Sequence, residues 1–89
     1  MATALARRAS FAETRLRLST AVDAWRAAEG ARRDAGLAFA EVDRRHRQGL
    51  AGGDVDAHAH AEDALFEAEA RAAAARGALT TLIAPTQRP

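Results

Sequence analysis

Apolar and small side chains recur at alternating intervals of three and four residues along most of this 89-residue chain, a spacing typical of amphipathic helices. In the first half, a row of large side chains seven residues apart contains Phe11, Leu18, Trp25 and Phe39, and Arg32 interrupts it. A row of mostly small residues runs beside it. Such alternation of large and small residues along one seam is typical of a coiled coil.

The second half repeats this pattern with smaller residues. Its two rows are His58, Leu65, Ala72 and Leu79, and Ala61, Ala68, Ala75 and Leu82. The stretch GLAGGD, residues 49–54, separates the halves. Gly49 can adopt the left-handed backbone conformation that ends a helix, with Leu50 packing behind it. Asp54 can serve as the N-cap of the next helix.

Two starts are open for the first helix, because Thr3 is a candidate cap and SFAE at residues 10–13 matches a capping box. The expected elements are a helix from about Thr3 or Ser10 to residue 48, a turn at 49–53, a helix over about 54–83 that stops before Pro85, and a disordered tail at 85–89. Residues 1–84 would then form a single helical-hairpin domain.

Folding the helices back at the turn pairs residues whose numbers sum to about 104. In this register Phe39 faces Leu65, Trp25 faces Leu79, and alanines meet in alternate layers. We therefore predict an all-α fold, a long antiparallel helical hairpin with an alanine-rich coiled-coil seam.

The first helix is predicted to be longer than the second, so residues 3 to about 20 have no partner within the hairpin. This segment nevertheless carries large apolar side chains, and Phe66 lies off the seam of the second helix. Exposed apolar groups of this kind indicate a partner. We expect a homodimer that forms a four-helix bundle, or another helical protein, with an interface that includes Leu5, Phe11, Leu18, Trp25, Arg32 and Phe66.

Composition supports the helical prediction, since alanine dominates and both prolines fall in the last five residues. Thirteen basic residues, all arginine, balance twelve acids and leave a net charge of +1. The interspersed signs argue against a nucleic-acid binder, and no apolar run is long enough for a membrane span. The absence of lysine is typical of a high-GC bacterial genome, and we expect a cytoplasmic protein.

The residues offer little for catalysis, with no cysteine and no phosphate-binding loop. The register instead brings His46 and His58 together beside the turn, and Glu62 follows His58 by one helical turn. These three side chains are a candidate site for a divalent transition metal such as Zn²⁺. Two alternatives stay open here: both histidines simply pack at the solvent-exposed end of the seam, or their protonation makes the turn sensitive to pH.

Residues 45–79, RHRQGLAGGDVDAHAHAEDALFEAEARAAAARGAL, resemble the helical-hairpin segment of TolC-like outer-membrane efflux proteins. The resemblance rests on Arg45, Gly49, Leu50, Asp54, Val55, Ala57 and Leu65, whereas His46 stands where the family has an aromatic residue. It implies a long antiparallel hairpin with an exposed tip, and a docking role for Gly49, Leu50 and Asp54.

The sequence thus favours a non-catalytic interaction or oligomerisation module, such as a scaffold, an adaptor or a small chaperone. A metal- or pH-responsive hairpin that uses His46 and His58 is one alternative. A small enzyme, or an enzyme subunit with its site between protomers, is the other.

Overall fold

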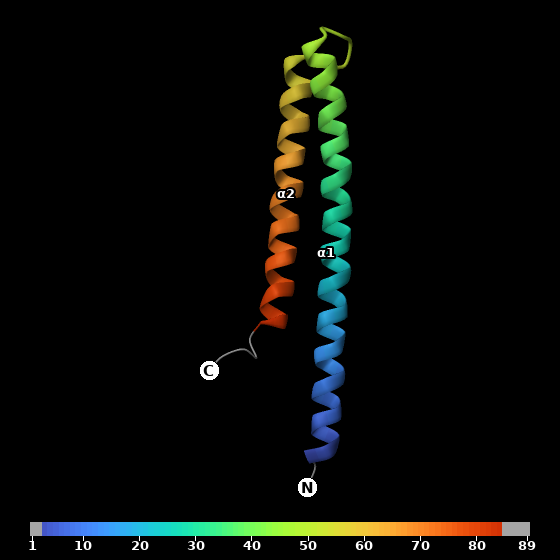
Figure 1. Ribbon diagram of the computed structural model, residues 1–89, viewed down its shortest axis with the longest axis vertical. Coiled ribbons are helices and arrows are strands. Elements are labelled where there is room, and N and C mark those ends of the chain that lie inside the picture. Colours follow the sequence, from blue (N-terminus) through green and yellow to red (C-terminus); the bar gives the residue numbers. More distant parts are fainter. Residues whose placement is uncertain (1–2, 85–89) are drawn as a thin grey trace.

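The computed structural model describes residues 3–84 and shows two long helices packed side by side (Figure 1). Helix α1 spans Thr3–Arg47, and helix α2 spans Val55–Ile83. The helices run antiparallel, and the molecule is a rod of 73 × 25 × 14 Å. The described part of the chain contains no strand. The predicted all-α helical hairpin is confirmed, whereas the predicted tail at residues 85–89 lies outside the described residues.

Helix α1 begins at Thr3, the earlier of the two predicted starts, and continues through Ser10 without a break. Because the helix begins seven residues earlier, Ser10 lies inside it and does not cap it, and the Ser10 carbonyl oxygen accepts a hydrogen bond from the Thr14 hydroxyl at 2.9 Å. Residues 4–9 are alanine, leucine and arginine, which are among the best helix formers. Helix α1 therefore has 45 residues, against 29 for α2.

Helix α1 ends in a Schellman motif around Gly49, the predicted stop. Gly49 has a φ of 67°, and its N–H donates to the His46 carbonyl oxygen at 3.3 Å. The Leu50 N–H reaches back to the Arg45 carbonyl oxygen at 2.9 Å. These two bonds satisfy carbonyl groups that the end of a helix otherwise leaves unpaired.

The remaining turn residues pack onto the last turn of α1. Gly52 has a φ of 85°, and the Arg45 guanidinium donates a hydrogen bond to the Ala51 carbonyl oxygen at 3.1 Å. Gly53 is buried, and a β-carbon there would meet the backbone of Arg45 and His46. This close approach brings the chain back beside α1, so that α2 starts in contact with it.

The seam between the helices consists of half-buried or buried residues at the predicted positions. On α2 these are His58, Ala61, Leu65, Ala68, Ala72, Ala75 and Leu79, and on α1 they include Trp25, Ala28, Arg32, Ala35, Phe39 and Val42. Among the described residues, Ala68 and Ala72 are the only buried apolar side chains, 6% and 3% exposed. Two helices cannot enclose a large side chain, so the core is confined to small residues at their closest approach.

The side chains near the turn interdigitate. The rings of His46 and His58 lie 4.7 Å apart, in agreement with the predicted register. The Phe39 ring lies 5.3 Å from the His58 ring, and Leu65 Cδ1 lies 4.0 Å from the place where a Gly36 β-carbon would stand. Phe39 and Leu65 were predicted to face each other; Phe39 packs toward His58 and Leu65 toward Gly36, because a side chain in such a seam packs between partner residues.

Helix α1 extends well beyond the end of α2 (Figure 1). We call residues 3–20 the overhang, and every one of them is exposed. The structure thus agrees with the expectation that this segment has no partner within the hairpin. Within residues 3–84, neither helix combines the length and apolar character that a membrane span requires.

Candidate interaction surfaces

The overhang displays large apolar side chains on two faces. Phe11 and Leu18 continue the seam row of α1, but α2 ends before it can cover them, and Phe11 is 66% exposed. Leu5 and Leu16 lie on a second face, 73% and 67% exposed. They share that face because eleven residues make about three helical turns. Leu18 is less exposed, at 38%, so three predicted interface residues, Leu5, Phe11 and Leu18, are free to contact a partner.

An apolar hollow of about 650 Å³ marks the place where α2 ends beside α1. Its walls come from both helices and consist of Leu16, Arg17, Thr20, Ala21 and Ala24 of α1 with Ala78, Thr81 and Leu82 of α2. The hollow exists because α1 continues where α2 stops. It extends the apolar surface of the overhang onto the hairpin body.

The outer face of α2 exposes a second apolar surface near the turn. Phe66, a predicted interface residue, is 71% exposed, and Val55 is 72% exposed. Sequence reasoning did not select Val55 as an interface residue. Its position eleven residues before Phe66, which places both on one face, is the signal that identifies it. Leu37 of α1, also exposed, lies on neither surface and was missed as well.

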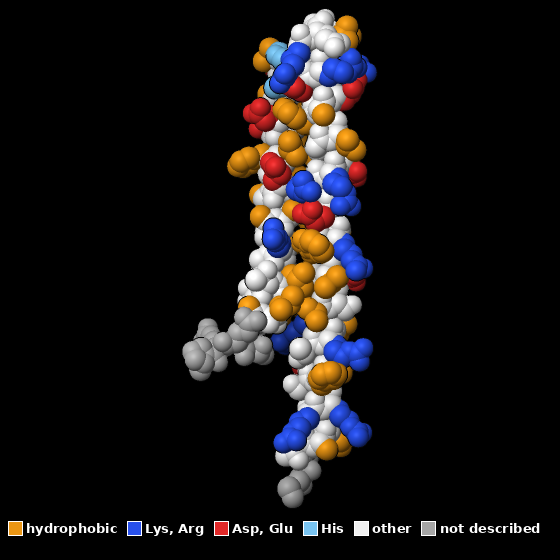
Figure 2. Space-filling view, in the orientation of Figure 1, with side chains coloured by type: hydrophobic (Ala, Val, Ile, Leu, Met, Phe, Trp, Pro, Cys, Tyr) orange, Lys and Arg blue, Asp and Glu red, His pale blue; other side chains and the backbone are white. Residues whose placement is uncertain are grey.

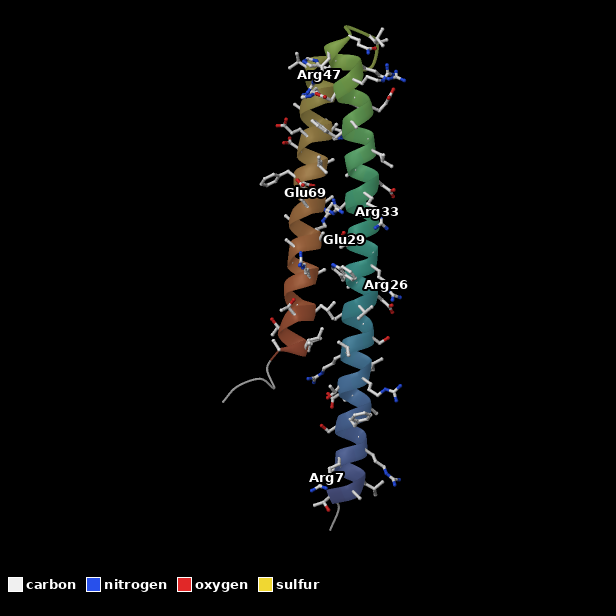
Figure 3. All side chains as sticks on the ribbon, in the orientation of Figure 1. Arg7, Arg26, Glu29, Arg33, Arg47 and Glu69 are labelled. Carbon is white, nitrogen blue, oxygen red and sulfur yellow. The ribbon has the colours of Figure 1, made fainter. Side chains whose placement is uncertain are left out.

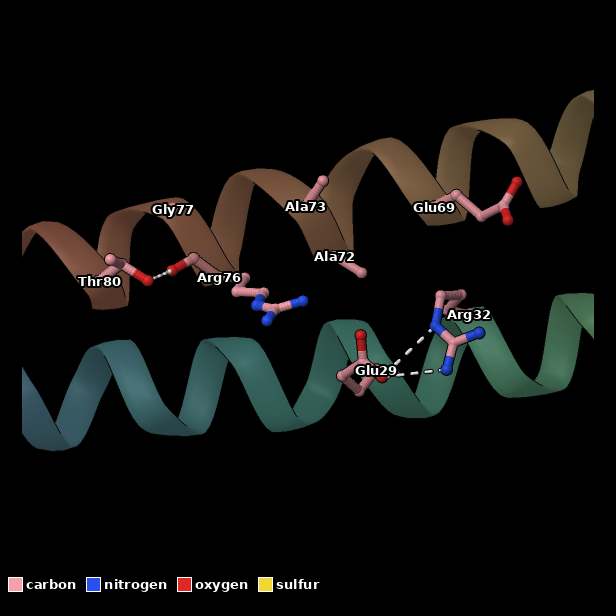
Figure 4. A pocket seen from close by; sticks show the side chains of 8 residues that line it. All are labelled: Glu29, Arg32, Glu69, Ala72, Ala73, Arg76, Gly77 and Thr80. Atoms are coloured by element: carbon pink, nitrogen blue, oxygen red, sulfur yellow. Dashed lines mark hydrogen bonds and ion pairs between the residues drawn. The ribbon is translucent and has the colours of Figure 1, made fainter.

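The structure places the other two predicted interface residues on the seam within the hairpin. Trp25 is half-buried, and its indole Nε1 is buried with no hydrogen-bond partner among the described residues. Arg32 is also half-buried, and its Nη2 donates to Glu29 Oε2 at 3.0 Å (Figure 4). The hydrogen bond and the charge of Glu29 raise the pKa of Arg32, burial opposes them, and Glu69 adds a smaller raise.

A polar cleft of about 650 Å³ surrounds this ion pair. Glu29 and Arg32 project from α1 toward α2, where Glu69 and Arg76 line the opposite wall (Figures 3 and 4). The floor is formed by Ala72, one of the two core alanines. The cleft alternates acidic and basic groups and holds no unbalanced charge, which suits an internal ion-pair network better than a ligand site.

Of the three predicted metal ligands, His46 and His58 lie together, with ring centroids 4.7 Å apart, but no third described residue completes a metal-binding group with them. His58 Nε2 donates to Asp43 Oδ1 at 3.0 Å, and His46 Nδ1 donates to the Gly53 carbonyl oxygen at 2.8 Å. The hydrogen bond from His58 lowers the pKa of Asp43, although burial opposes it. Among the described residues, no group of three His, Cys, Asp or Glu side chains could hold a metal ion.

The set of His46, His58 and Glu62 is therefore not assembled in this structure. Asp43, from the opposite helix, supplies the carboxylate in place of Glu62, and Arg47 binds its other oxygen at 2.9 Å. Because the His58 Nε2 donates its proton to Asp43, only the other nitrogen of that ring could bind a metal in this arrangement.

The three predicted tip residues have different roles. Gly49 ends α1, and Asp54 caps α2 by accepting a hydrogen bond from the Ala57 N–H at 3.3 Å. Leu50 is 47% exposed and is the apolar side chain that the turn presents to solvent. Local chain geometry thus accounts for the glycine and the aspartate without a partner.

Glu41 anchors an exposed ion cluster nearly two turns before the end of α1. Arg44 Nη2 and Arg45 Nε bind Glu41 Oε1 at 2.7 and 2.8 Å. The hydrogen bonds from Arg44 and Arg45 lower the pKa of Glu41 to about 2. Because Arg45 also holds the turn carbonyl of Ala51, this cluster links the last turn of α1 to the loop.

Charge is distributed unevenly along the rod. The overhang carries four arginines and one glutamate, and its Glu13 is already paired with Arg17 at 2.7 Å. Residues 54–69 carry six acids and no arginine. In Figure 2, blue arginine side chains mark the overhang and red acidic side chains lie along the part of α2 nearest the turn.

No protein-family model matches the chain, and neither a curated protein nor a solved structure matches it significantly. The resemblance of the turn to the tip of TolC-like efflux proteins therefore stays a prediction.

Proposed function

We propose that this chain is a non-catalytic oligomerisation and protein-interaction module, a helical hairpin completed by the helices of a second copy. The observation that supports this proposal most directly is the thin core. In the described residues two alanines are the only buried apolar side chains, whereas ten large apolar side chains are exposed. A small domain with so little core is marginal alone and usually gains stability by association.

The apolar side chains of the overhang supply the energy for this association. Full burial of a leucine or phenylalanine stabilises by about 1.5–3 kcal/mol, so covering Leu5, Phe11 and Leu16 would contribute on the order of 5 kcal/mol per chain. Two hairpins packed together would bury these groups on both chains and form a four-helix bundle. Such a bundle suits a scaffold, an adaptor or a small chaperone.

Light scattering coupled to size exclusion tests the proposal. A dimer would give twice the chain mass of 9.4 kDa, and its melting temperature would rise with chain concentration. Replacing Phe11 and Leu16 by serine is expected to shift the population toward monomer without loss of helix in the hairpin body. A wild-type chain that stays monomeric at 100-fold different concentrations, with an unchanged melting temperature, would contradict self-association.

A further inference from the structure

The polarised charge of the rod determines how two copies fit together. The overhang, at one end, has an excess of three positive charges, since four arginines oppose one glutamate. The acidic segment, residues 54–69, lies at the other end and has six acids. Residues 34–47, which run beside it on α1, carry three arginines and three acids and so leave its excess uncompensated.

Several of these charges have no ion-pair partner among residues 3–84. Arg8 and Arg15 form no ion pair with another described residue, and neither do Glu62 and Asp63. The two ends also expose similar apolar surfaces, around Leu5 and Leu16 in the overhang and around Val55 and Phe66 in α2. Each end therefore offers apolar area together with charge that the opposite end of another copy would neutralise.

We infer that the partner is a second copy, aligned antiparallel with the first so that the two rods overlap along their whole length. The overhang of each chain then packs against residues 34–69 of the other, which we call the tip half. This inference rests on the proposed self-association and specifies its geometry. A parallel pair would place overhang beside overhang and acidic segment beside acidic segment, which costs energy through like-charge repulsion. Two overhangs joined end to end would also bring like charges together.

The lengths of the elements agree with this arrangement. The overhang has 18 residues and is about 27 Å long, and residues 55–69 of α2 cover about 22 Å. At each end of the pair, both helices of one chain would lie beside the overhang of the other, in the place that the α2 helix of that other chain leaves empty. The α2 helices would overlap only near the middle, where four helices meet. A two-fold axis satisfies both overhangs at once and closes the assembly as a dimer.

Distance measurements between labels test the orientation, and the absence of cysteine in the chain makes labelling specific. Ala9 and Ala59 are exposed, so Ala9→Cys and Ala59→Cys are suitable sites. Ala9 lies about 9 Å from the start of α1, so two copies of residue 9 would be about 55 Å apart in this antiparallel pair. A mixture of chains labelled at 9 and at 59 would give a short distance, comparable to the 25 Å width of the rod.

A charge reversal tests the cause of the orientation. Arg8→Glu with Arg15→Glu is expected to raise the dissociation constant of the dimer roughly tenfold at low salt. Adding Glu62→Arg and Asp63→Arg to the same chain should restore tight association, because both complementary surfaces are then reversed. Circular dichroism of each variant provides the control that the helices still form. The effect should shrink in concentrated salt, which screens exposed charges.

The possible results separate the two proposals. A monomeric wild type contradicts self-association and the antiparallel arrangement with it. A wild-type dimer with a short distance between the two residues 9 leaves self-association intact and overturns the orientation. The orientation is also overturned if adding Glu62→Arg and Asp63→Arg to the Arg8→Glu, Arg15→Glu chain fails to restore dimer formation. A long 9–9 distance, a short 9–59 distance and restored binding together support it.

Discussion

Gly53 is the residue at which a single added methyl group should disturb the hairpin most. A β-carbon at this position would lie 2.7 Å from Arg45 Cβ and would meet the Arg45 carbonyl carbon and the His46 nitrogen even more closely. Two of these three atoms belong to the backbone of α1 and cannot turn aside as a flexible side chain would. The change Gly53→Ala must therefore push the turn away from the helix end.

The expected cost follows from the kind of contact. Overpacking of a close-packed site typically destabilises by about 1–3 kcal/mol. Gly77→Ala and Gly30→Ala are matched controls, because a β-carbon at either helical position meets nothing within 4 Å. In a helix, alanine is favoured over glycine by about 0.5–1 kcal/mol, so both controls should stabilise the protein.

Thermal unfolding followed by circular dichroism measures the difference, at one fixed chain concentration because association shifts the midpoint. The Gly53 and Gly77 variants should differ by about 1.5–4 kcal/mol, which corresponds to at least about 6 °C in a chain of this size. Equal midpoints for Gly53→Ala and Gly77→Ala would refute the close packing of the turn on α1.

Three further substitutions probe the helix ends and the seam. Asp54→Ala removes the N-cap of α2 and should lower the free energy of unfolding by about 1 kcal/mol in urea titrations, whereas Asp54→Ser should retain most of it. The lowered pKa of Glu41 stabilises the folded state at pH values above the ordinary glutamate pKa, and this contribution is lost as the pH falls toward about 2. Glu41→Gln should therefore flatten the decline of the urea midpoint below about pH 4.5. A variant with the same pH profile as the wild type would contradict this role of Glu41. Arg32→Leu should leave the free energy of unfolding unchanged or raise it slightly, because a half-exposed ion pair contributes little while leucine adds apolar contact. A clear fall in the urea midpoint would show instead that the ion pair holds the seam together.

The helices and their turn were predictable because local signals agree there with the global pattern. The three–four spacing of apolar residues identifies both helices, and Gly49 and Asp54 mark the turn through their own conformational preferences. The start of α1 was not decided by the sequence, since the capping box at Ser10 competes with good helix formers before it. In the structure the helix formers prevail, because no residue between Thr3 and Ser10 interrupts the helix.

The environment of the histidines shows where sequence reasoning stops. The predicted pairing of residues across the hairpin correctly placed His46 beside His58, because this contact depends only on the register of the two helices. They could not show that Asp43 rather than Glu62 would reach His58, because this depends on side-chain rotamers across the seam. Val55, the exposed neighbour of the predicted Phe66 on the outer face of α2, was missed for another reason. A spacing of eleven residues lies outside the heptad that describes the seam.

Trp25 gives this hairpin a natural optical reporter. It is the only tryptophan, and the chain has no tyrosine. Its indole is held between the helices, and the buried Nε1 has no partner for a hydrogen bond within the described residues. Its fluorescence therefore comes from one place, about midway along the rod and just inside the junction with the overhang. Separation of the two helices would admit water to this nitrogen and shift the emission to longer wavelength, even if each helix stayed intact. Comparing emission with circular dichroism would thus distinguish opening of the hairpin from melting of its helices.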